Sequence, residues 1–137
     1  MSRGMGAWDL GPLDNDDALD FLGDLEEAPD ALGALREALT LPAGYLEAPD
    51  GSIAIAAAAA VAVIRRGGVQ GVAPQFGERI NALNVSGEQA DELAPLAVAA
   101  LERVASEESE LVELWDEAGE TEAWRATLEP LRAGVST

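Results

Sequence analysis

The chain has 137 residues, of which 48% are hydrophobic, 25% charged and only 4% aromatic. This length supports one hydrophobic core and is too short for two typical domains. Its 26 acidic residues against 8 basic ones, all of them arginine, give a formal net charge of -18. Nucleic-acid phosphates and anionic membrane surfaces attract clustered basic residues, so neither is an expected partner. We therefore expect a single acidic domain over residues 1–137 that needs no cofactor.

The chain contains no cysteine and no histidine. Without cysteine there is no disulfide, no thiolate nucleophile and no thiolate metal site. Without histidine there is no imidazole ligand and no nucleophile–histidine relay. Most common catalytic designs are excluded, which favours a protein that is not an enzyme.

The charge is concentrated in the two ends of the chain. Residues 1–40 carry a net charge of -8 and residues 87–137 carry -10, whereas residues 41–86 are neutral. An apolar run of twelve residues, 53–64, lies in this neutral middle and includes five consecutive alanines. A membrane-spanning helix needs about 20 residues, so the run predicts a buried core helix over residues 52–66. The N-terminus has no apolar signal core, and we expect a cytoplasmic location.

Helical periodicity governs the segments before this core helix. Ala18, Phe21, Leu22 and Leu25 recur at helical spacing, after Asp14 or Asn15 as the helix cap. A second helix follows Pro29 and ends before Pro42, because a residue that precedes proline disfavours helical geometry. Residues 43–51 contain glycine and proline and predict a loop.

After the core helix, Gly67 is expected to end it in a left-handed conformation. A short helix is predicted over residues 75–83, and Ser86 with Gln89 forms a capping box for the next helix. Pro95 is expected to kink or restart that helix. Ser106 is expected to cap a further helix, Gly119 to end it and Thr121 to open the last one. The sequence therefore predicts an all-α bundle of five or six amphipathic helices around the alanine-rich helix.

Acidic residues at the start of the first helix form one candidate site. Their spacing allows three interpretations: a helix cap with an acidic first turn, a contact for a partner, or ligands for a hard divalent cation. An EF-hand is excluded, since its sixth position requires glycine and Leu19 stands there. The candidate residues are Asp14, Asn15, Asp16, Asp17 and Asp20.

A second acidic cluster lies late in the chain, at Glu107, Glu108, Glu110, Glu113, Asp116 and Glu117. The apolar stripe of this segment is expected at Leu111, Leu114, Trp115 and Ala118. The glutamates then point away from the core, and a solvated face is favoured over a carboxylate metal site. The glycine-rich residues 67–71 follow a helix and have no lysine, so they predict a connection rather than a phosphate loop. The tryptophans Trp8, Trp115 and Trp124 are expected core anchors, and an exposed Trp8 would instead indicate a partner-binding anchor.

Two motifs carry a resemblance to a known family. Residues 6–18, GAWDLGPLDNDDA, resemble the opening signature of the bacterial family called domain of unknown function 4259, with Asp9 for glycine and Leu13 for phenylalanine. Residues 109–119, SELVELWDEAG, followed by Trp124-Arg125 and Leu131-Arg132, resemble its second signature. The resemblance implies a small helical bacterial protein and points to no particular activity. The pairing of the two signatures also suggests that Trp8 and the turn at Asn15 and Asp16 pack near Trp115 and Trp124.

These observations favour a non-enzymatic interaction protein that meets a basic partner, in the manner of an immunity protein or a nucleic-acid mimic. The alternative is a carboxylate metal-dependent hydrolase, which would need at least three converging carboxylates. A third possibility is that the acidity serves only solubility or a salty cytoplasm.

Overall fold

A computed structural model describes residues 11–136 of the chain, and within this range it is entirely helical apart from loops and one isolated bridge. The predicted all-α bundle is confirmed. Its helices are α1 (Asp16–Glu27), α2 (Ala31–Leu39), α3 (Ala48–Arg66), α4 (Pro74–Asn81), α5 (Gly87–Val104), α6 (Glu110–Ala118) and α7 (Thr121–Val135).

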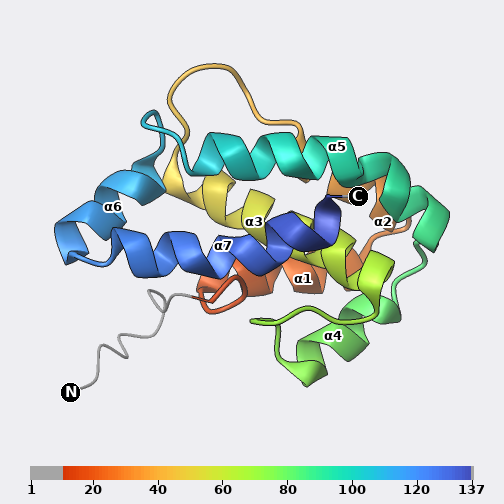
Figure 1. Cartoon of the computed structure of the whole chain (residues 1–137). Helices are drawn as coiled ribbons and strands as arrows, with labels where there is room; N and C mark the ends of the chain where they lie inside the picture. Colours follow the sequence, from red (N-terminus) through yellow and green to blue (C-terminus); the bar gives the residue numbers. More distant parts are fainter. Residues whose placement is uncertain (1–10, 137) are drawn as a thin grey trace.

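The alanine-rich helix α3 is the centre of the bundle, as predicted (Figure 1). It contacts each of the other six helices, most extensively α5 and α7. All five residues of its alanine run, 56–60, are buried. Small side chains let the surrounding helices approach closely on every side. Because the helix is buried on every side, it is apolar all round.

Helix α3 begins earlier than predicted, because residues 48–51 form its first turn rather than the end of a loop. Pro49 occupies one of the first two helical positions, where a missing N–H is tolerated and its fixed φ suits the helix. Gly51 is buried beneath α6, and a Cβ added there would lie 2.8 Å from Leu111 Cδ1. The glycine leaves room for the Leu111 side chain, and it does not break the helix.

The length of α3 also changes the comparison with a membrane span. Its 19 residues have a mean hydropathy of 1.4 over the most apolar stretch, so by length and composition the helix could cross a membrane. The twelve-residue run underestimated this length. However, 72% of that stretch is buried inside the protein, and contact with six helices accounts for its composition.

Several predicted helix ends are confirmed. The Asn15 side chain accepts a 2.9 Å hydrogen bond from the Ala18 N–H at the start of α1. Ser86 and Gln89 form both halves of the capping box of α5. Gly67 and Gly119 end α3 and α6 with φ of 86° and 74°. The short predicted helix is α4.

Other details differ from the prediction. Of the two predicted effects of Pro95, a restart does not occur, because α5 runs continuously through this exposed residue. Ser106 does not cap α6; its hydroxyl donates to the Arg103 carbonyl at the end of α5. Helix α6 starts at Glu110, after an isolated parallel bridge between Leu46 and Ser109 holds the preceding backbone extended. On α6, Val112 is buried and Ala118 is exposed, so the predicted stripe is wrong at Ala118.

Trp115 and Trp124 are 5% and 3% exposed and belong to the core, as predicted. Trp8 lies outside the described residues, and so does its expected contact with these two rings.

Candidate functional site

The acidic turn before and within α1 combines one capping residue with separated carboxylates. Asn15 caps the helix, and the Asp14 carboxylate accepts a 3.1 Å hydrogen bond from the Gly11 N–H. Asp16, Asp17 and Asp20 are exposed on the helix that follows. Asp16 and Asp17 lie in the first turn, where negative charge complements the positive end of the helix dipole.

The described carboxylates of the turn are not arranged as a metal site. Across residues 11–136, no group of three or more Asp or Glu side chains is placed so that it could hold a metal ion. The side chain of Asp14 faces its own turn, whereas the other carboxylates spread along the outside of the helix. Among the three interpretations, the geometry fits a cap with an acidic outer face.

This outer face continues along the whole of α1. We call it the acidic face of α1; it consists of Asp16, Asp17, Asp20, Asp24 and Glu27, all exposed. No residue of α1 is basic, and within the described chain no hydrogen bond or ion pair neutralises these five carboxylates. Leu19 lies at the edge of this face with 37% of its surface exposed, one of two large hydrophobic residues so exposed in residues 11–136. The face therefore offers negative charge, unpaired within the described residues, beside an apolar side chain.

Most of the arginines, in contrast, bind groups of the chain itself. Six of the seven arginines in residues 11–136 bind oxygen atoms of the chain itself. Arg65, whose side chain is 10% exposed, donates to the Gly134 carbonyl at 2.9 Å and pairs with Asp91 at 2.7 Å. Arg66 donates to the Ser136 carbonyl at 3.0 Å, so both residues bind the negative end of α7. These bonds hold both guanidinium groups at the end of α7, and Arg66 itself is exposed.

Three further arginines also bind oxygen atoms of the chain. Arg103 donates to the Gly44 carbonyl and Arg125 to the Ala105 carbonyl, both at 2.8 Å. Arg132 pairs with Glu102 at 3.1 Å. The glycine-rich residues 67–71 connect α3 to α4, and Asn81 donates to the Gly67 carbonyl.

The late acidic cluster is exposed except at one residue. Glu107, Glu108, Glu113, Asp116 and Glu117 are exposed, as predicted. Glu110 is only partly exposed, and its carboxylate accepts a 2.7 Å hydrogen bond from the Ala48 N–H at the start of α3. Glu113 accepts a 2.9 Å hydrogen bond from the hydroxyl of Tyr45. Two glutamates of this cluster therefore hold the loop before α3 against α6.

Two side-chain contacts shift the pKa of a titratable group. The hydrogen bond from Tyr45 to Glu113 raises the pKa of Tyr45 to about 12, since ionisation would place two negative charges together. The guanidinium of Arg79 binds both oxygens of Glu26, at 2.8 and 2.6 Å, and lowers the pKa of that carboxyl. Neither pKa is moved toward neutral pH, so neither group behaves as a general acid or base at that pH.

The chain matches a family model over residues 6–127, which is most of its length. The family is described as Domain of unknown function (DUF4259). The chain belongs to this family. Its membership agrees with the two sequence motifs and carries no assigned reaction or ligand. Searches of curated proteins and of solved structures find no match.

Sequence reasoning missed part of the α1 surface. It singled out residues as far as Asp20, but Asp24 and Glu27 extend the same exposed face by two further turns. The spacing of Asp16, Asp20, Asp24 and Glu27 at three or four residues is the signal that could have found them. Leu19 could not be identified from its type alone, because an isolated exposed leucine is common.

Proposed function

We propose that this DUF4259 protein is a non-enzymatic binding protein whose acidic face on α1 contacts a basic surface of another protein. The observation that carries the proposal is that most arginines are bound within the chain, whereas the carboxylates of the acidic face are not. Six described arginines bind the chain's own oxygens, whereas the five carboxylates of the acidic face have no such partner. A surface of one sign steers an oppositely charged partner and discriminates against others.

The exposed Leu19 adds an apolar contact at the edge of this charged face. Interfaces commonly combine a desolvated apolar contact with polar groups beside it, and here the neighbouring polar groups carry a single sign of charge. Blocking of a basic site, as an immunity protein or a nucleic-acid mimic does, is the activity that such a surface best serves. The alternative hydrolase gains no support within residues 11–136, where no three carboxylates converge.

The test compares two variants of equal net charge. One carries Asp20→Asn, Asp24→Asn and Glu27→Gln on the acidic face of α1. The other carries Glu92→Gln, Glu117→Gln and Glu129→Gln, three exposed residues on other helices. Each triple change removes three negative charges and leaves the described hydrogen bonds in place.

Immobilised parent and variants are used to capture proteins from the host at 50 and 300 mM NaCl. We expect a basic protein to be retained by the parent at low salt, released at high salt and lost from the α1 variant alone. Equal retention by both variants would show that the acidity acts only as bulk charge. Retention of no basic protein by the parent would contradict the proposal.

A further inference from the structure

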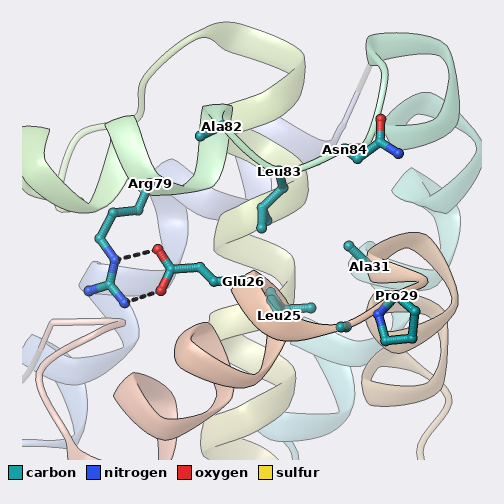
Figure 2. A pocket seen from close by; sticks show the side chains of 9 residues that line it. Leu25, Glu26, Pro29, Ala31, Arg79, Ala82, Leu83 and Asn84 are labelled. Carbon is teal, nitrogen blue, oxygen red and sulfur yellow. Dashed lines mark hydrogen bonds and ion pairs between the residues drawn. The ribbon is translucent and has the colours of Figure 1, made fainter.

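A cavity of about 360 Å³ opens between the end of α1, the start of α2 and the end of α4 (Figure 2). Its apolar lining includes Leu25, Pro29 and Leu83. Leu25 is 2% exposed and forms the floor, whereas Leu83 is half-buried and points into the space between α1 and α4. The Arg79–Glu26 ion pair lies along one side, and Asn84 lies at the opposite side.

The cavity is electrically suited to a cation. Helices α1 and α4 both end there, at their caps Ala28 and Ala82, and a helix end of this kind carries partial negative charge. Helix α1 has no basic residue in its last turn to offset this charge. The N-terminus of α2 also reaches the cavity, but the Asp30 carboxylate already accepts the Gly33 N–H there.

The surrounding carboxylates strengthen the same preference. Asp24, Glu27 and Asp30 are exposed on α1 and on the turn that follows it. The one basic residue in the lining, Arg79, is already bound to Glu26 through two hydrogen bonds. The side chains of this ion pair are 40% and 36% exposed, so a competing cation from solution can reach the Glu26 carboxylate.

We propose that this cavity receives the side chain of an arginine or lysine from the basic protein partner. The inference rests on the proposed function and names an anchor point for that partner. The aliphatic stem contacts the wall formed by Leu25 and Leu83, and the cationic head binds Glu26 in competition with Arg79. Long basic side chains combine an apolar stem with a charged head, which matches this arrangement. The end of the acidic face of α1 adjoins the cavity, so one partner can contact both.

The test uses N-acetyl-L-arginine amide as the probe and N-acetyl-L-glutamine amide as its neutral counterpart. Each is titrated into ¹⁵N-labelled protein, and amide chemical shifts are followed by NMR. We expect the arginine probe to shift the amides of residues 25–31 and 79–84 and the glutamine probe to leave them in place. Leu83→Ala should weaken the arginine probe because it removes part of the apolar wall.

Two variants of the ion pair give the deciding result. Glu26→Gln removes the proposed acceptor and should weaken the probe about threefold, the order expected for an exposed charge pair. Arg79→Gln removes the competitor and should strengthen binding by a similar factor. If the ion pair only supported the structure, both substitutions should change the affinity for the probe in the same direction. Glu102→Gln, which breaks the exposed pair with Arg132, is the matched control and should leave the affinity unchanged.

The outcomes separate this inference from the proposed function. Equal effects of Glu26→Gln and Arg79→Gln, or shifts confined to the acidic face of α1, would overturn the cavity as the anchor. A partner that depends on Asp20, Asp24 and Glu27 would then still support the proposed function. Absence of any arginine-specific shift in residues 25–31 and 79–84 would likewise overturn the anchor.

Discussion

The carboxylate of Glu110, the first residue of α6, accepts a 2.7 Å hydrogen bond from the backbone N–H of Ala48, the first residue of α3. The local cap residue of α3, Glu47, makes no side-chain capping bond. The central helix is therefore capped by a residue 62 positions later in the chain. The Leu46–Ser109 bridge lies beside this contact, with hydrogen bonds of 2.8 Å from Leu46 N to Glu108 O and from Glu110 N to Leu46 O.

Glu110→Ala should lower the free energy of unfolding by about 1–2 kcal/mol, the usual range for loss of a helix cap. Glu110→Gln keeps an acceptor oxygen and should lose less. Urea denaturation followed by circular dichroism measures both. Glu107→Ala is the control, since Glu107 is exposed and caps no helix. A Glu110→Ala protein as stable as this control would show that water replaces the carboxylate without loss.

Two helical glycines provide an opposed pair of predictions. A Cβ added to Gly134 would lie 2.7 Å from Ala62 Cβ, so Gly134→Ala should force α7 away from α3 and destabilise the protein by about 1–3 kcal/mol. A Cβ added to Gly23 on α1 would meet no other atom within 4 Å. Gly23→Ala should therefore stabilise by about 0.5–1 kcal/mol through helix propensity. Thermal melts of both variants check the two signs, and equal shifts would contradict the close approach of α7 to α3.

Sequence patterns predicted the features that depend on neighbouring residues. The Asn15 cap, the capping box at Ser86 and the left-handed Gly67 each involve atoms within a few positions, so their signals are local. The alanine-rich stretch also predicted the central helix, because burial on all sides requires apolar residues on all sides.

Features that depend on distant residues were missed or misplaced. The start of α6 is set by the bridge between Leu46 and Ser109, and a capping pattern at Ser106 carries no information about Leu46. The binding of Arg65 and Arg66 to the end of α7 depends on carbonyl groups, which have no side-chain signature in the sequence. The cavity beside Glu26 is formed by three helix ends that meet only in the folded chain.

The melting temperature should rise with NaCl between about 10 and 150 mM, a range in which the screening length falls from about 30 to 8 Å. The reason is that the carboxylates of the acidic face of α1 have no basic partner among the described residues, so their mutual repulsion is screened by salt. Calorimetry at constant pH measures the trend. The α1 triple variant, with three charges fewer, should show a smaller rise, and a flat response in the parent would indicate local neutralisation.

Tyr45 is the only tyrosine of the chain, so the absorbance of tyrosinate reports on this residue alone. Its pKa is raised from 10.0 to about 12 by the hydrogen bond to Glu113, and the folded protein should titrate near the higher value. Because the folded state holds this proton more tightly than the unfolded state, the contribution to stability is complete below pH 10 and is lost as the pH rises toward 12.

Glu113→Gln keeps an acceptor for the hydroxyl but removes the negative charge, so it should move the titration midpoint of Tyr45 back toward 10. Tyr45→Phe should remove the tyrosine-dependent part of the alkaline decline in stability, which urea denaturation at pH 9, 10 and 11 measures. Glu117→Gln, on the same helix and exposed, controls for the general loss of charge. Circular dichroism at each pH establishes that the chain is still folded. A parent midpoint near 10 in folded protein would contradict the Tyr45–Glu113 contact and, with it, the attachment of the loop before α3 to α6.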